Sequence, residues 1–474
     1  MSREKAITLA KELQNFWSEE ACSVSTCNAW LEVTDPYTLE TVANLRLISP
    51  DGLSEAIDKL RCGEFGSTPL LKKLEIFANL LDIHKDDIAG IITLESGKPI
   101  NESLKEIELS QRYLKSYLSS LESLSPSTMT LEEAVCRVVN EPVGKAALIV
   151  PWNFPFLMLA RKVIPALIAG CGVILKPAPE TPLSAIFFCK LLREAGVDTD
   201  LFFVAISNET EFGDVVCERF DIRKISFTGS TEVGKLLFQK SAKTLKRLTL
   251  ELGGNAPFLV LENANPETFC QWLRYSKFRN CGQACTAVNR VLVHERHYQF
   301  LVDQYVQLAR NLKQGDGFSP ETDIGPLIND FAVEKIRSIV EDAVSKGAKC
   351  YPEQPTFTRN LKPTVLWDLP LTARAFHEEI FGPVVAIWRG QSDDELLSMA
   401  NDTTYGLSAY IFGGKEAMDY AKQLDFEMIG VNTGFVSYPE FPFGGRKLSG
   451  FGKEGGGLVA IEGYSNKKIL VEKI

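Results

Sequence analysis

The sequence predicts an α/β fold with parallel, doubly wound sheets, and three observations support it. Between residues 144 and 227, short apolar runs rich in β-branched residues alternate with helix-like stretches. The same alternation restarts after residue 251. The chain has 474 residues, more than one hydrophobic core usually holds. Two doubly wound α/β domains are therefore the simplest account, and we expect ligands at the carboxyl ends of the strands.

Local patterns predict the individual elements. Residues 1–20 carry apolar side chains at helical spacing, and residues 53–119 do the same, so helices dominate the first quarter. Strands are predicted at 135–139, 144–150, 172–176, 224–227, 258–260, 290–293, 384–388 and 409–412. Helices are predicted between them, for example at 158–170, 183–194 and 332–346. Residues 464–474 resemble an added strand, which often pairs with another strand.

Composition and charge exclude several functions. A formal net charge of −10 without a basic cluster argues against nucleic acid or an anionic membrane as the partner. Eleven cysteines, an odd number irregularly spaced, indicate a reducing compartment. Residues 1–20 lack the apolar core of a signal peptide, and the apolar stretch at 146–156 is too short to span a bilayer, so the predicted location is cytoplasmic. Neither histidines nor cysteines show metal-site spacing, so no metal is predicted.

Cys285 and Glu251 are the candidate reactive pair. Cys285 lies beside small residues in a Gly-bearing turn, and Glu251 lies on an apolar segment that ends in Gly-Gly. A thiolate nucleophile needs a base or a positive environment, and apolar surroundings raise the pKa of a carboxyl toward the range of a general base. Alternatively, Cys285 is a small buried hydrophobe and Glu251 belongs to an ion pair. The two residues are far apart in the sequence, which does not show whether they are in contact.

Three further residues occupy positions typical of ligand binding. Gly229 stands where a predicted strand ends and a helix begins, so the helix N-terminus could bind pyrophosphate, although no GxGxxG fingerprint is present. Lys176 ends another predicted strand and could bind ribose hydroxyls, but a solvated lysine in a proline-rich turn is the preferred interpretation from composition alone. Asn153 could donate its amide to an oxyanion, whereas a packing loop is the simpler alternative.

Together these segments resemble the aldehyde dehydrogenase superfamily over nearly the whole chain. The matching segments, in family order, are Trp152-Asn153-Phe154-Pro155, Lys176-Pro177-Ala178, Phe227-Thr228-Gly229-Ser230, Glu251-Leu252-Gly253-Gly254, Gly282-Gln283-Ala284-Cys285, Glu378-Glu379-Ile380-Phe381-Gly382-Pro383 and Pro442-Phe443-Gly444-Gly445. The resemblance implies an NAD(P)-binding domain over 1–120 and 142–250, a catalytic domain over 251–440, and a small β oligomerisation arm over 121–141 and 455–474. It also implies a homodimer or homotetramer.

The resemblance assigns roles to matching residues. Cys285 is implied as the nucleophile that attacks an aldehyde, with Asn153 and the Cys285 backbone N–H holding the oxyanion. Glu251 is implied as the base that activates water to hydrolyse the thioester. The implied cofactor, NAD or NADP, is bound by Trp152, Lys176, Gly229, Ser230, Glu379 and Phe381. Of these, Lys176 and Glu379 contact the riboses, Ser230 the pyrophosphate, and Phe381 the nicotinamide side.

A finer resemblance, to the succinate-semialdehyde dehydrogenase subfamily, rests on residues 159–163, 276–280 and 431–437. There, the residues matching Arg161, Arg279 and Ser437 hold the carboxylate at the far end of the substrate. Guanidinium groups suit a carboxylate because they donate paired, charge-assisted hydrogen bonds. The alternative is that both arginines form structural ion pairs.

At two positions this chain departs from the family, which limits how far the family's residue roles apply to it. Ala287 stands where some of these enzymes carry a second cysteine, so a disulfide at that spacing is excluded. Pro179 stands where NAD-preferring relatives often place a glutamate, which leaves NAD versus NADP open. The main hypothesis is oxidation of succinate semialdehyde, or a close ω-carboxy aldehyde, to the dicarboxylic acid. The rivals are a dehydrogenase for glutarate semialdehyde or an aromatic aldehyde, and a non-catalytic protein that keeps the fold.

Overall fold

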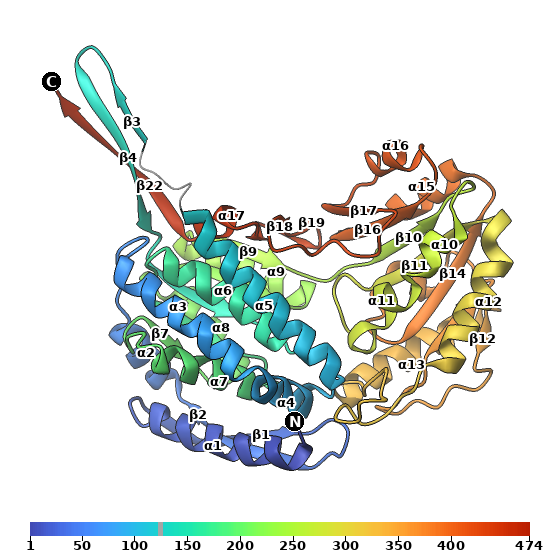
Figure 1. Cartoon of the computed structure of the whole chain (residues 1–474), viewed down its shortest axis with the longest axis horizontal. Coiled ribbons are helices and arrows are strands. Elements are labelled where there is room, and N and C mark those ends of the chain that lie inside the picture. The colour runs from blue at the N-terminus through green and yellow to red at the C-terminus, as the bar shows by residue number, and fades with distance from the viewer. Residues whose placement is uncertain (122–126) are drawn as a thin grey trace.

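A computed structural model describes residues 1–121 and 127–474. Within these residues, three sheets of three or more strands organise the chain (Figure 1). One has six strands, one has seven, and a three-stranded sheet protrudes at the upper left of the view. Helices cover the two larger sheets, and the predicted α/β fold is confirmed.

The six-stranded sheet forms from strands between residues 145 and 251 and one late strand. Its strands, in spatial order, are β20 (Gly450–Phe451), β9 (Arg247–Glu251), β8 (Ile222–Thr228), β5 (Lys145–Ile149), β6 (Val173–Lys176) and β7 (Phe202–Val204). The strands from β9 to β7 are parallel, and β20 runs antiparallel to β9. The crossover helices are α6 (Pro155–Ile168), α7 (Pro182–Glu194), α8 (Glu209–Glu218) and α9 (Thr231–Ser241). The strand order reverses beside β5, which marks the edge where such sheets bind ligands.

The N-terminal elements pack around this sheet. They are α1 (Arg3–Ala21), β1 (Thr26–Thr34), β2 (Thr41–Ile48), α2 (Pro50–Lys59), α3 (Thr68–Ile83), α4 (Lys85–Ser96) and α5 (Ile100–Ser120). In α1, Ala6, Ala10, Leu13 and Trp17 recur at helical spacing and are buried, as their apolar pattern predicts. The antiparallel β1–β2 hairpin was not predicted, because most residues of β1 are at least partly exposed and their apolar alternation is weak.

The seven-stranded sheet forms from the second half of the chain. Its strands, in spatial order, are β12 (Lys349–Tyr351), β13 (Thr364–Trp367), β14 (Val384–Gly390), β11 (Val288–His294), β10 (Ala256–Val260), β16 (Ser408–Phe412) and β17 (Met428–Val431). Only β12 runs antiparallel to its neighbour in this described sheet. The longer helices beside it are α12 (Glu295–Asn311), α13 (Asp330–Ser345) and α15 (Asp393–Asn401). All seven residues of β11 are buried, as expected for a strand covered on both faces.

The protruding sheet joins distant parts of the chain. Its strands, in order, are β22 (Ser465–Lys473), β4 (Ala134–Pro142) and β3 (Ser127–Thr130). It exposes apolar side chains of both segments, including Met129, Ile469 and Val471. Residues 122–126 of the predicted arm lie outside the described residues, and the domain boundaries remain a prediction.

A late segment runs between the two large sheets. Besides β20, it contains β18 (Pro442–Phe443), β19 (Arg446–Lys447) and β21 (Glu454–Gly455), with α17 (Leu458–Glu462) packed against α6. β19 pairs with β15 (Tyr405–Gly406), whereas β20 pairs with β9 in the other sheet. Among the described helices, none is long and apolar enough to cross a membrane. Among all the residues that the structure describes, no group of three or more potential metal ligands is present.

Candidate active site

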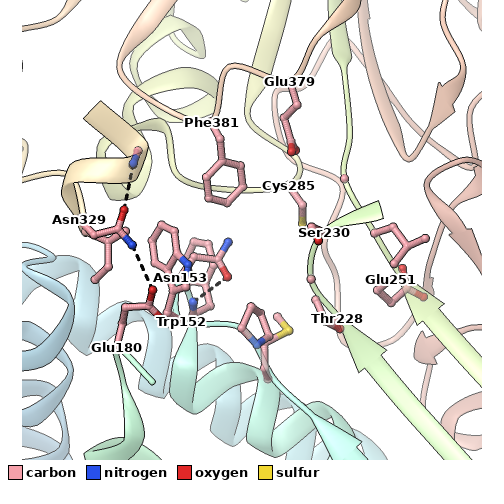
Figure 2. Close-up of a pocket in the computed structure, with 18 of the residues that line it drawn as sticks. Trp152, Asn153, Glu180, Thr228, Ser230, Glu251, Cys285, Asn329, Glu379 and Phe381 are labelled. Carbon is pink, nitrogen blue, oxygen red and sulfur yellow. Dashed lines mark hydrogen bonds between the residues drawn. The ribbon is translucent and has the colours of Figure 1, made fainter. Parts of the chain in front are cut away.

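A cavity of about 330 Å³ lies where the carboxyl ends of β5, β8 and β9 meet the loops that precede β11 and β14 of the seven-stranded sheet. Its lining includes Trp152, Asn153, Arg161, Gly229, Ser230, Glu251, Cys285, Glu379, Phe381, Phe443 and Glu454. Figure 2 shows Cys285 near the centre, with Phe381 on one side in the view and Glu251 on the other. The structure therefore gathers most of the predicted site residues around this cavity, with Ser437 in contact with Arg161. Lys176 and Arg279 line neighbouring cavities instead.

The loop before Cys285 has an unusual backbone. Asn280, Cys281 and Gly282 have φ of +50°, +57° and +72°, the left-handed region that only glycine adopts readily. A Cβ at Gly282 would overlap the carbonyl oxygen of Gly382. Hydrogen bonds hold this conformation: Gln283 donates through Nε2 to Asn280 O at 3.2 Å and accepts at Oε1 from Ile328 N at 3.0 Å. The turn thus fixes the direction in which Cys285 enters the cavity.

Two ionisable groups face this cavity with strongly perturbed pKa values. Burial raises the pKa of the Cys285 thiol to about 12, while nearby Arg161 acts in the opposite direction. Burial, followed by repulsion from Glu454, raises the pKa of Glu251 well above its usual value. Among the described residues, neither carboxyl oxygen of Glu251 has a hydrogen-bond partner. A buried carboxyl without a partner beside a thiol is suited to proton transfer.

Asn153 is tied to the cysteine loop. Its Nδ2 donates to the Gln283 carbonyl at 3.0 Å, which leaves a second N–H on the same nitrogen for another acceptor. The backbone carbonyl of Asn153 accepts from Asn280 Nδ2 at 2.9 Å and from Lys98 Nζ at 2.8 Å. Hydrogen bonds of both its side chain and its backbone therefore hold Asn153 beside the loop that carries Cys285.

Two buried lysines that the sequence motifs do not single out support the site. Lys98 forms an ion pair with Glu106, whose Oε1 accepts from Phe156 N at 2.9 Å at the start of α6. Lys162 forms an ion pair with Glu454 and donates to Ser226 Oγ at 2.8 Å. Lys162 could have been identified from the sequence, because Arg161 and Lys162 are the charged residues in an otherwise apolar stretch at 155–168.

The residues predicted to bind cofactor divide between two cavities. In the Cys285 cavity, the Trp152 and Phe381 rings pack edge to face with centroids 5.6 Å apart, and Glu379 accepts from Gly254 N at 2.9 Å. Ser230 caps α9 there by accepting from Val233 N at 3.3 Å. Lys176 instead lines a neighbouring cavity of about 250 Å³. It is buried, which is incompatible with the solvated-lysine interpretation.

Glu180 and Lys176 line different cavities. It accepts a hydrogen bond from Asn329 Nδ2 at 3.1 Å and lines the Cys285 cavity (Figure 2), whereas Pro179 lines the Lys176 cavity. Glu209 contributes a carboxyl to the lining of the Lys176 cavity. The open helix end at Ser230 and the buried amine of Lys176 fit the phosphate and ribose parts of a dinucleotide.

The structure places two of the three predicted carboxylate-binding residues in direct contact. The buried Arg161 donates through Nη2 to Ser437 Oγ at 2.5 Å and to Tyr113 Oη at 2.7 Å. Arg279 lines an adjacent cavity of about 440 Å³, where its Nη1 donates to Tyr275 Oη at 2.8 Å. The Phe154 side chain lines both cavities. Within the described chain, neither guanidinium has a carboxylate at ion-pair distance, which argues against the structural ion-pair alternative.

A cysteine, a buried carboxyl and an oriented amide on one cavity, beside a helix end that suits a dinucleotide, define a cysteine-dependent oxidoreductase. The sequence profile described as "Aldehyde dehydrogenase family" matches residues 23–470, and the chain belongs to this family. It is therefore an NAD(P)-dependent aldehyde dehydrogenase.

Several known proteins are similar to this chain. A probable succinate-semialdehyde dehydrogenase [NADP(+)] of Sinorhizobium fredii is 40% identical over 82% of this chain and 80% of its own. An aspartate-semialdehyde dehydrogenase (non-phosphorylating) of Halomonas elongata is 36% identical over 92% of this chain and 91% of its own. The crystal structure of succinate-semialdehyde dehydrogenase from Burkholderia pseudomallei has a TM-score of 0.89 and 35% identity, covering 94% of this chain and 95% of that one.

Proposed function

We propose that this enzyme oxidises succinate semialdehyde, or a close ω-carboxy aldehyde, to the dicarboxylic acid with NAD or NADP. The observation that carries the proposal is Arg161, a buried guanidinium on the Cys285 cavity with no carboxylate partner in the described chain. A buried charge without a counter-ion is costly, and a substrate carboxylate would supply one. The Ser437 hydroxyl accepts from Arg161, so its own hydrogen is available to the same carboxylate.

The chain's own residues carry out most of the reaction. Cys285 attacks the aldehyde carbon, and the free N–H of Asn153 Nδ2 donates to the resulting oxyanion, as does the Cys285 backbone N–H. Because burial holds the thiol protonated, its proton has to pass to solvent before the attack, and the nearby positive charge of Arg161 favours the thiolate. The product of this step is a thiohemiacetal on Cys285.

The chemistry supplied by the dinucleotide, when bound, is hydride acceptance, which oxidises the thiohemiacetal to a thioester. Gly229 and Ser230 at the start of α9 would hold its pyrophosphate, Glu379 and Lys176 its riboses, and the Trp152–Phe381 ring pair its nicotinamide side. Glu251 then takes a proton from water, which hydrolyses the thioester and releases the acid. Pro179 and the orientation of Glu180 toward Asn329 leave the Lys176 cavity without a carboxylate from this turn, which is compatible with either cofactor.

A substrate panel tests the proposed function. Specificity constants for succinate semialdehyde, glutarate semialdehyde, aspartate semialdehyde and butanal, each with NAD and NADP, separate charge recognition from chain length. We expect the carboxylated four-carbon aldehyde to exceed butanal by about two to three orders of magnitude. Arg161→Met should remove most of this difference, because it leaves a side chain of similar length without the charge. Equal constants for succinate semialdehyde and butanal in the wild-type enzyme would contradict the proposal.

The protruding sheet supports a second proposal, that the enzyme is a homodimer or homotetramer. Its exposed apolar residues, Met129, Ile469 and Val471 among them, lie on the segments predicted to form the oligomerisation arm. Light scattering after size exclusion measures the assembly directly. Val471→Asp should weaken it, whereas a monomer in the wild-type protein at micromolar concentration would refute it.

A further inference from the structure

We propose that Tyr113 is a positioning residue that sets selectivity for carboxylated aldehydes by holding the Arg161 guanidinium in its orientation toward the Cys285 cavity. This inference rests on the proposed function, because it assigns Arg161 to the substrate carboxylate. Tyr113 itself lies on α5, is fully buried and is outside the cavity lining. It therefore acts through Arg161 rather than on the substrate.

The contacts of Arg161 show how the orientation is fixed. Nη2 donates to Tyr113 Oη at 2.7 Å and to Ser437 Oγ at 2.5 Å, which uses both of its hydrogens. The guanidinium carbon lies 4.7 Å from the centroid of the Tyr113 ring and 4.2 Å from that of Phe443. Two hydrogen bonds and two aromatic rings thus hold the planar group.

The remaining donors of Arg161 are left for a ligand. Nε is buried and has no hydrogen-bond partner among the described residues. A buried donor without a partner is unfavourable, so its direction matters to whichever acceptor enters the cavity. As long as Tyr113 and Ser437 hold Nη2, the substrate carboxylate meets a preorganised guanidinium and does not have to reorient it.

Loss of the Tyr113 hydroxyl should disturb this orientation without removing the charge. Tyr113→Phe keeps the ring against the guanidinium but leaves one Nη2 hydrogen unpaired in a buried site. The group then gains from turning toward another acceptor, and the substrate carboxylate has to compete with that turn. Substrates without a carboxylate do not experience the change, so the effect is specific to one substrate class.

Tyr117 provides a matched control on the same helix. It lies one turn after Tyr113 on α5 and is equally buried. Its hydroxyl donates to the backbone carbonyl of Arg161 at 3.3 Å and not to the guanidinium. Tyr117→Phe therefore removes a buried hydroxyl near the same residue and leaves the side-chain orientation of Arg161 alone.

The test compares kcat and KM for succinate semialdehyde and butanal in Tyr113→Phe, Tyr117→Phe and Arg161→Met. We expect Tyr113→Phe to raise KM for succinate semialdehyde about tenfold, with kcat and the specificity constant for butanal changed less than about threefold. Tyr117→Phe should keep the wild-type ratio of the two specificity constants. Equal shifts of that ratio in both tyrosine variants, or no shift in Tyr113→Phe, would overturn the inference.

A double-mutant cycle separates this inference from the proposed function and from general destabilisation. If Tyr113 acts through the guanidinium, Tyr113→Phe should have no further effect on the ratio in an Arg161→Met background. An additive effect in that background would show that Tyr113 acts elsewhere. If Arg161→Met leaves the ratio unchanged, the proposed carboxylate recognition itself is wrong. If Arg161→Met lowers the ratio and Tyr113→Phe does not, only the positioning role is wrong.

Discussion

Replacing Glu251 with glutamine should separate the two halves of the reaction. Hydrolysis of the thioester needs a base on the Cys285 cavity, and a positioned general base contributes about 10²- to 10⁴-fold. Glutamine has the same shape but cannot accept the proton of water. We therefore expect kcat to fall by about this factor, while a burst of NAD(P)H of about one equivalent per active site remains.

The structure also predicts the effect of this substitution on stability. The pKa of Glu251 is raised in the folded protein, so the carboxyl stabilises the fold at low pH and this contribution is lost as pH rises through the raised pKa. A difference of one between the folded-state and unfolded-state pKa of a group corresponds to about 1.4 kcal/mol of unfolding free energy. The glutamine variant lacks the titration, so its melting temperature relative to wild type should rise as the solution becomes alkaline.

Rapid mixing with succinate semialdehyde and excess cofactor provides the assay. Glu180→Gln is the control, because Glu180 is a partly buried carboxyl on the same cavity whose pKa is also raised by burial, but it already has Asn329 as a partner. This control should not separate a burst from steady turnover. Loss of the burst together with turnover in Glu251→Gln would show that Glu251 is needed for acylation, and unchanged turnover would remove it from the mechanism.

Three other predictions concern the surroundings of the thiol. Gly282→Ala should lower the unfolding free energy by about 1–3 kcal/mol and reduce kcat, because a Cβ at this position overlaps Gly382 and the residue has a φ of +72°. Urea denaturation and activity measured at matched stability test this, and an unchanged unfolding free energy would refute the predicted strain. Lys98→Met should lower the unfolding free energy by about 3–5 kcal/mol, because it leaves Glu106 buried without its counter-ion. Urea denaturation measures this, and an unchanged unfolding free energy would show that the ion pair is dispensable. Iodoacetamide should alkylate Cys285 in the cofactor-free enzyme about tenfold faster per pH unit from about pH 7 to about pH 10, because burial raises the pKa of this thiol to about 12. An alkylation rate that reaches a plateau near neutral pH would contradict this.

Strands with a strong local pattern could be predicted from the sequence. The runs at 172–176 and 290–293 correspond to β6 and β11, which are buried on both faces and therefore consist largely of apolar residues. β20 could not be predicted, because its two residues carry no periodic signal and are held in a strand by pairing with β9. The β1–β2 hairpin was missed because its first strand is largely exposed.

The position of a candidate residue could be predicted where a short motif carries it, as for Cys285 and Glu251, which line one cavity in the structure. It was not predictable where distant segments meet. Arg161 and Ser437 were proposed together from resemblance, but the hydrogen bond that joins residues 276 positions apart is visible only in the fold. Tyr113 and Glu454 gave no signal, since a tyrosine in an amphipathic helix and a glutamate near a glycine run are ordinary in composition.

The late segment that crosses between the two large sheets has a consequence for biosynthesis. β20 covers the edge of β9 beside Glu251, and Phe443 and Glu454 complete the wall of the Cys285 cavity. A growing chain on the ribosome therefore contains Cys285 long before the cavity around this residue can close. The edge of β9 has no strand partner during that interval and could pair with another chain. Synthesis of the last residues therefore both covers this edge and completes the cavity around Cys285. A chain released early would carry Cys285 in an unfinished site.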